Sequence, residues 1–168
     1  MSTENRLTTW ASFVLMAFAA LCPFTLSAAD EVVKNASDNS KADAIVGNYY
    51  ISHKGEESKV RFSKNADGTY KCQIYWVAKD KDASGKKILD VKNPDKSLRD
   101  TPSDRIVLID GLKYNSGKKQ WDGAKIYDPM RGIKVSVTCK FTDDGKLSLR
   151  GSVMGIGETV LWKPIAAE

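Results

Sequence analysis

Few residues of this sequence combine in a pattern that could perform catalysis. The chain holds a single histidine, His53, and a serine or cysteine nucleophile with an imidazole base would have to use it. The residues around it, from Ile51 to Glu56, do not form a nucleophile elbow, and the G-x-S-x-G motif is absent. A histidine-based zinc site lacks ligands for the same reason. The pattern favours a surface histidine and a non-enzymatic protein.

Acidic residues suggest two other kinds of site, and neither pattern is specific. Asp90, Asn93 and Asp95 fall in one polar stretch and offer oxygen ligands for calcium, but the spacing lacks the glycine and distal glutamate of an EF-hand. Asx-turn and proline-turn chemistry explains the same residues without a metal. Asp122 and Asp128 could form a glycosidase-like carboxylate pair, but nothing in the sequence ties them together. We expect no metal and no cofactor.

The N-terminus has the order of a secretory signal peptide. Met1–Arg6 is polar, Ala11–Leu26 is almost wholly apolar, and Ser27–Ala29 offers small residues before the charged Asp30. The apolar run is shorter than the roughly 20 residues that a transmembrane helix needs, and Pro23 interrupts it. We therefore predict cleavage of residues 1–29, no stable membrane span afterwards, and a periplasmic or extracellular location.

Residues 30–44 are polar and without periodicity, so we expect a flexible lead-in to a domain at 45–168. The formal net charge of +5 comes from lysines spread among aspartates. The sequence has no arginine-rich stripe and no aromatic ladder, so a nucleic-acid partner is not expected. A weak attraction to anionic lipid or envelope polysaccharide remains compatible with this charge. The sequence does not predict an oligomeric state.

Apolar and polar residues alternate with period two along most of the remaining chain, which is typical of strands with one buried face. Glycine, asparagine and aspartate occur at the joints, as hairpin turns require. The predicted strands are 45–53, 58–64, 69–77, 105–110, 120–127, 134–141, 147–153 and 159–163. This pattern predicts an all-β fold, a small antiparallel β-barrel of about eight strands. A two-sheet sandwich has the same alternation and stays an alternative.

One connection is too long for a simple meander. Residues 78–105 are rich in charge, glycine, proline and asparagine, and loops of this length are usually functional covers or disordered segments. The short apolar stretch Ile88–Val91 predicts that part of the loop packs against the barrel.

Cys72 and Cys139 fall on the inward faces of the predicted third and sixth strands. Strands three places apart in a barrel of this size put the two Cα atoms beyond the roughly 7 Å that a disulfide tolerates. We therefore expect two small buried thiols. A flattened barrel or a different strand order would permit the bridge.

Large aromatic side chains either fill the core of a small barrel or line a ligand pocket at its mouth. If the interior is open, the residues expected in the pocket wall are Tyr49, Trp76, Trp121 and Tyr127. The sequence leaves the two cases open.

Three segments resemble one known family. They are Asp90–Arg99, Trp121–Gly132 and Leu147–Gly151, the last followed by the closing Trp162. In this order behind a signal peptide they are similar to the secreted bacterial proteins of domain-of-unknown-function family 2147, over about residues 45–163. The resemblance implies a lipocalin-like barrel exported to the periplasm or beyond, and it supplies no catalytic residues. Gly47-Asn48-Tyr49 also resembles the G-x-W that opens a lipocalin-type barrel.

The residues of these segments are expected to have structural roles. Asp128 can cap the amides of its own turn, Pro129 fixes φ, and Gly132 permits a left-handed exit. Arg150 could pair with such an aspartate. The motif residues are Asn93, Pro94, Asp128, Pro129, Gly132, Arg150, Gly151 and Trp162.

The chain also departs from the family pattern at several positions. Cys72 and Ala124 stand where similar sequences have glycine, and Glu158 stands where they have arginine. The glycine usual near residues 103–105 is missing as well. A binding site shared by the family could therefore be altered in this chain.

These observations favour an exported protein that binds a small hydrophobic or lipid-like ligand in its barrel, with residues 78–105 as a cover. Two alternatives remain. One is an envelope interaction module with a filled core, and the other is a hydrolase acting on an envelope component.

Overall fold

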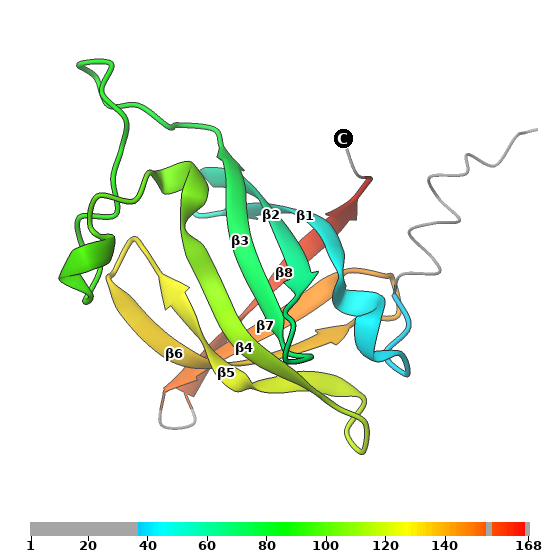
Figure 1. Cartoon of the computed structure of the whole chain (residues 1–168). Helices are drawn as coiled ribbons and strands as arrows, with labels where there is room; N and C mark the ends of the chain where they lie inside the picture. Colours follow the sequence, from blue (N-terminus) through cyan, green and yellow to red (C-terminus); the bar gives the residue numbers. More distant parts are fainter. Residues whose placement is uncertain (1–36, 154–155, 167–168) are drawn as a thin grey trace, which may run out of the picture.

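The backbone of the computed structural model closes into a single β-barrel (Figure 1). The structure describes residues 37–153 and 156–166, so the predicted signal peptide lies outside the described residues. The strands are β1 Gly47–His53, β2 Glu56–Lys64, β3 Tyr70–Val77, β4 Val107–Asn115, β5 Gln120–Asp128, β6 Ile133–Phe141, β7 Leu147–Val153 and β8 Ile156–Ile165.

Each strand pairs antiparallel with the next in sequence, and β8 returns to pair with β1. The predicted eight-stranded antiparallel barrel is therefore confirmed, and the sandwich alternative is wrong. Closure pairs the backbone N–H and C=O groups that the two edge strands of an open sheet would leave without partners. The fourth strand runs beyond its predicted end at residue 110 because Gly111, with φ of 75°, bends the strand without ending it. No helix in the described ranges is long and apolar enough to cross a bilayer.

The strand register shifts at several places, and one of these shifts, near the end of β3, breaks the expected alternation. The register shifts so that Val60 pairs with Ile74 but Lys59 pairs with Trp76, which leaves Tyr75 as the extra residue of a β-bulge. A bulge inserts one residue and reverses the inward and outward phase beyond it. Trp76 consequently lies on the outer surface, 38% exposed. Its prediction as a wall residue of the interior is wrong.

One end of the barrel is closed by the residues just before β1. A short 3₁₀ helix, η1 at Ala42–Ile45, packs there with Ile45 fully buried (Figure 1). Trp121 Nε1 donates to the Ala42 carbonyl at 2.8 Å, and the Tyr49 hydroxyl donates to the Ile45 carbonyl at 2.8 Å. These bonds tie strands that are far apart in sequence to one plug.

The plug extends back to Asn39, whose side chain forms two hydrogen bonds with the backbone of one β6 residue. Asn39 Nδ2 donates to the Phe141 carbonyl at 2.8 Å, and the Phe141 amide donates to Asn39 Oδ1 at 2.7 Å. The Tyr114 hydroxyl donates to the Asn39 carbonyl at 2.8 Å. Residues 37–44, expected to be flexible, are therefore docked on the barrel, because their polar groups satisfy backbone atoms at its rim.

The hydrophobic core fills the half of the barrel next to this plug. Trp121 packs edge-on against Phe141 at 5.7 Å between ring centroids, and Tyr49 packs in the same way against Phe62 at 5.7 Å. Cys72 and Cys139 are buried among these side chains as free thiols, and burial raises the pKa of both. The fully buried residues with the largest side chains are Trp121, Tyr49, Tyr70, Phe62, Ile45, Ile109, Leu112, Leu147, Leu149 and Val60.

Substituting Asn39→Ala is expected to destabilise the protein by about 1–3 kcal/mol, because the Phe141 amide and carbonyl lose their partners at the edge of the core. Urea unfolding followed by circular dichroism measures this change. Ser40→Ala is the matched control, since among residues 37–153 and 156–166 the Ser40 hydroxyl bonds the neighbouring Asp38 and not the barrel. Equal stability of the two variants would contradict the docked plug.

Candidate functional site

The half of the barrel opposite the plug is hollow. A cavity of about 940 Å³ opens at this end, between the strand ends and the long connection from β3 to β4. Most of its lining is aliphatic. The lining side chains inside the barrel include Ile51, Ile74, Val77, Ile106, Leu108, Ile126, Val135, Val137, Leu149, Val160 and Trp162. Tyr127, on the other face of β5 from Ile126, lines the cavity beneath the lid.

The cavity exists because the inward positions of this half carry smaller side chains than those of the other half. Gly151 faces the interior of β7, where a Cβ would stand 3.1 Å from Val135 Cγ2. Around it the wall is mainly valine and isoleucine, whereas aromatic rings fill the plugged half. Branched aliphatic side chains of this size leave the centre of an eight-stranded barrel unfilled. Trp162, 2% exposed, lies at the boundary and lines the cavity.

The long connection, residues 78–105, covers one side of the mouth, and we call it the lid (Figure 1). Two short 3₁₀ helices lie within it, η2 at Lys96–Leu98 and η3 at Ser103–Arg105. Two extended segments of the lid pair with each other through backbone hydrogen bonds. The Asp90 amide donates to the Thr101 carbonyl, and the Ser103 amide donates to the Ile88 carbonyl, each at 2.9 Å. Ile88 and Leu89 line the cavity, as the predicted packing of the apolar stretch requires.

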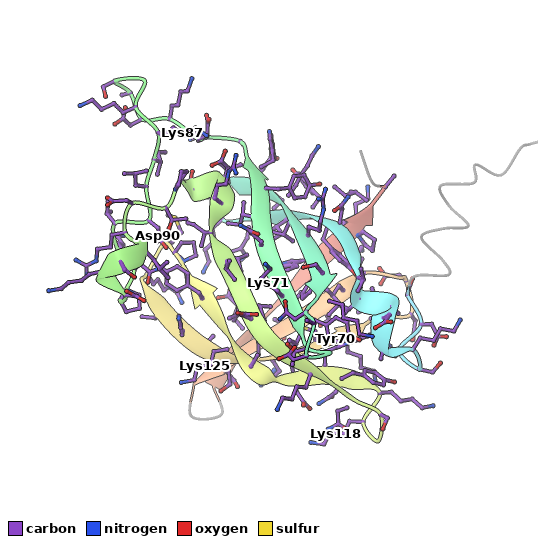
Figure 2. All side chains as sticks on the ribbon, in the orientation of Figure 1. Tyr70, Lys71, Lys87, Asp90, Lys118 and Lys125 are labelled. Carbon is purple, nitrogen blue, oxygen red and sulfur yellow. The ribbon has the colours of Figure 1, made fainter. Side chains whose placement is uncertain are left out.

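A buried polar cluster fastens the lid to β5. The Tyr127 hydroxyl donates to Asp90 Oδ1 at 2.6 Å, and Asn93 Nδ2 donates to Asp90 Oδ2 at 2.7 Å. Asp90 and Asn93 are 3% and 4% exposed. Burial, together with the bond to Asp90, raises the pKa of Tyr127, so its hydroxyl stays a donor. Figure 2 shows Asp90 within the lid and far from Tyr70, which lies beside the plug.

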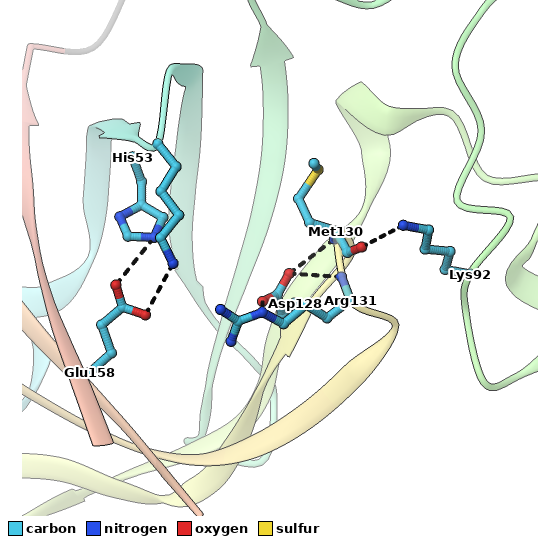
Figure 3. Close-up of polar contacts among 7 residues, drawn as sticks. His53, Lys92, Asp128, Met130, Arg131 and Glu158 are labelled. Carbon is cyan, nitrogen blue, oxygen red and sulfur yellow. Dashed lines mark hydrogen bonds and ion pairs between the residues drawn. The ribbon is translucent and has the colours of Figure 1, made fainter. Parts of the chain in front are cut away.

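A close backbone contact fastens the lid a second time, at the β5–β6 turn. Gly132 has φ of 70°, and a Cβ on it would stand 2.4 Å from the Lys92 carbonyl oxygen. Lys92 Nζ donates to the Met130 carbonyl at 2.7 Å (Figure 3). Only glycine permits both this conformation and this approach. The lid segment with Asn93-Pro94 and the turn segment with Pro129 thus form one structural unit.

Asp128 organises the turn itself. Its Oδ1 accepts from the Met130 amide at 2.9 Å and from the Arg131 amide at 3.2 Å, which is the predicted cap. Its second oxygen lies 3.6 Å from Arg131 Nε. Arg131, and not Arg150, is therefore the ion-pair partner of Asp128 in the described residues. Arg150 points outward from β7 between Thr138 and Thr159, and this orientation keeps it away from the turn.

The rim of the mouth opposite the lid carries a second ion-pair cluster. Glu158 lies 3.5 Å from His53 Nε2 and 3.4 Å from Lys54 Nζ, and all three line the cavity (Figure 3). The side chains are 40–59% exposed, so solvent weakens these ion pairs. His53 is therefore a rim residue with a carboxylate partner. In the described ranges, no group of three or more histidine, cysteine or acidic residues could hold a metal ion.

The predicted wall residues divide among three places. Tyr127 lines the cavity, Tyr49 and Trp121 are core residues beside the plug, and Trp76 lies outside. Period-two alternation identified Tyr49 and Trp121 as inward, but it failed for Trp76 and could not tell the filled half of the barrel from the open half. The aliphatic wall was missed for this reason, although the small inward residues Val135 and Val137 of β6 were a usable signal.

Comparisons with known proteins agree with this geometry. A family model described as an uncharacterized protein conserved in bacteria (DUF2147) matches residues 47–164. A solved structure, described as protein HP1028 from the human pathogen Helicobacter pylori that belongs to the lipocalin family, superposes with a TM-score of 0.59. It is 24% identical over 73% of this chain and 83% of that chain, which supports a lipocalin-like fold. No curated protein matches the sequence.

Substituting Tyr127→Phe is expected to loosen the lid, because Asp90 Oδ1 loses its donor within a buried cluster. The expected loss is about 1–3 kcal/mol of local stability. Hydrogen exchange of the amides of Asp90 and Ser103 measures it. Tyr114→Phe is the control, since that hydroxyl bonds the plug at the other end. Unchanged exchange in Tyr127→Phe would contradict the fastening role.

Proposed function

We propose that this chain, which belongs to the DUF2147 family of uncharacterized bacterial proteins, binds a small hydrophobic or lipid-like ligand in its barrel. The observation that carries this proposal is the cavity of about 940 Å³ under the lid. Small-molecule sites are concave, mostly apolar and usually about 300–1,000 Å³ in volume. A filled core would have favoured the interaction-module alternative.

The cavity offers an apolar ligand a favourable transfer from water. Its walls are aliphatic, with Trp162 toward the plugged end, so each CH₂ group buried there contributes about 0.8 kcal/mol. The plug closes the opposite end of the barrel, so the ligand enters and leaves at the mouth. A carrier with one mouth and a cover needs no catalytic group.

One polar feature indicates that the ligand is not purely hydrocarbon. Ser103, at the start of η3, lines the cavity, and its Oγ is buried without a hydrogen-bond partner in the described part of the chain. A buried hydroxyl without a partner costs about 1–3 kcal/mol. A shift of η3 that brought this buried oxygen to the cavity surface would let a ligand oxygen satisfy it, as in an alcohol, acid or ester of a lipid-like molecule.

The sequence of the N-terminus supports an exported location for this function. A signal peptide at residues 1–29 would deliver the carrier to the periplasm or beyond. Apolar molecules are poorly soluble in that aqueous compartment, and a soluble barrel with an apolar interior would hold them there.

Substituting Val160→Trp is expected to weaken binding of a fluorescent fatty-acid probe about tenfold, because the new ring occupies space where about two ligand CH₂ groups would lie. Fluorescence titration measures the dissociation constant. Leu161→Trp is the matched control, since the adjacent Leu161 points outward and is 50% exposed.

Equal affinities of the two variants would place the probe outside the barrel. Absence of saturable probe binding to the parent protein, at any lipid chain length tried, would remove the support for a lipid-like ligand. Thermal unfolding of each variant verifies that the substitution has left the barrel folded.

A further inference from the structure

The outer face of strands β8, β1, β2 and β3 carries cations interleaved with aromatic rings. Tyr50 on β1 pairs with Lys163 on one side and with Lys59 on the other, and Lys59 pairs in turn with Trp76. Arg61 lies two residues along β2, on the same face. We call this set the outer patch: Tyr50, Lys59, Arg61, Tyr75, Trp76 and Lys163.

The rings and cations of the outer patch are held against one another. Lys59 Nζ stands 5.5 Å from the ring centroid of Trp76, and the Arg61 guanidinium carbon stands 5.1 Å from that of Tyr75. The β-bulge at Tyr75 is what turns Trp76 outward. Trp76 is 38% exposed, so part of its indole ring is available at the surface to a partner.

The charge of this face is one-sided. Four cations point outward from it, Lys163, Lys59, Arg61 and Lys71, against one outward carboxylate on these strands in the described residues, Glu57. Alternating lysines, arginines and aromatic side chains on one face are typical of surfaces that lie at the boundary of an anionic bilayer. The aliphatic stems of lysine and the indole ring enter this boundary, and the charged groups meet the lipid phosphates.

We propose that the outer patch docks the protein on an anionic lipid surface. Acidic polysaccharide is the other polyanion that this charge could attract, but sugars bind aromatic residues through open ring faces. Here a cation lies over the rings of Trp76 and Tyr75, so less ring face is open to a sugar. Contact with lipid would use the exposed part of the Trp76 indole.

The outer patch also lies beside the mouth of the cavity. Val77, the residue after Trp76, lines the cavity, and Glu57 belongs to both the outer face and the rim. Docking would therefore bring the mouth next to the lipid surface, where a lipid-like ligand could enter. The docking itself does not depend on the proposed ligand binding, and it is measured without any ligand.

The test uses the protein exported by a bacterium, with its N-terminus identified from the intact mass. Vesicles of phosphatidylglycerol and phosphatidylcholine, and vesicles of phosphatidylcholine alone, are titrated while tryptophan emission is recorded. Trp121 and Trp162 are 0% and 2% exposed, so Trp76 is the reporter among the described residues. A blue shift with the anionic vesicles, absent in Trp76→Phe, is expected.

Two double variants separate docking from general electrostatic attraction. Lys59→Gln with Arg61→Gln is expected to lower the partition coefficient onto anionic vesicles roughly 25-fold, since each cation near an anionic surface contributes about fivefold. Lys125→Gln with Lys134→Gln removes the same charge from the outer face of β5 and β6, and less than a twofold change is expected. Figure 2 shows Lys125 on a different part of the barrel from Lys71. Any contribution of the residues before 37 to vesicle binding would be the same in the two double variants, so it would not affect their comparison.

Equal losses in the two double variants would overturn the proposal, because the attraction would then depend only on net charge. Binding to neutral vesicles as strong as to anionic ones would overturn it too. Retention on an immobilised acidic polysaccharide without vesicle binding would assign the face to a polymer. Lys59→Arg, which keeps the charge and the contact with Trp76, is expected to bind like the parent, and circular dichroism verifies that the variants fold.

Discussion

Eight strands closed into a barrel enclose a fixed volume, and the inward side chains either fill that volume or leave it open. In this protein they do both. Trp121, Phe141, Tyr49 and Phe62 fill the half next to the plug, whereas valine, isoleucine and Gly151 leave the other half hollow. Much of the packing energy of the fold is concentrated in the filled half. This division lets the open half keep a cavity of about 940 Å³ without losing the barrel.

Two of the three segments that resemble the family meet at the lid. Asp90 of the first segment accepts a hydrogen bond from Tyr127 of the second within a buried cluster, and the Lys92 backbone closely approaches Gly132. Polar groups buried this deeply are stable only when each has a partner, so the cluster fixes the lid in one position. The motif residues of these two segments are thus explained as the attachment of a cover, and the proposed binding surface is the aliphatic wall beneath it.

Much of this architecture could be predicted from the sequence, because period-two alternation and turn residues are local signals. Barrel closure, the inward positions on β6 and β7, and the cap formed by Asp128 all follow from such signals. The failures are non-local. A bulge at Tyr75 reversed the direction of Trp76, and hydrogen bonds between the Asn39 side chain and the Phe141 backbone ordered a segment whose composition is typical of disorder. The division between filled and open halves depends on how strands align across the barrel, which alternation does not encode.

The central claim is that the protein carries an apolar ligand, and native mass spectrometry of the exported protein tests it most directly. Protein released gently from the periplasm is measured intact and again after denaturation. We predict an additional mass in the native spectrum that is lost on denaturation and extracts into organic solvent. A native mass equal to that of the polypeptide alone, maintained after incubation with a total lipid extract, would contradict the account.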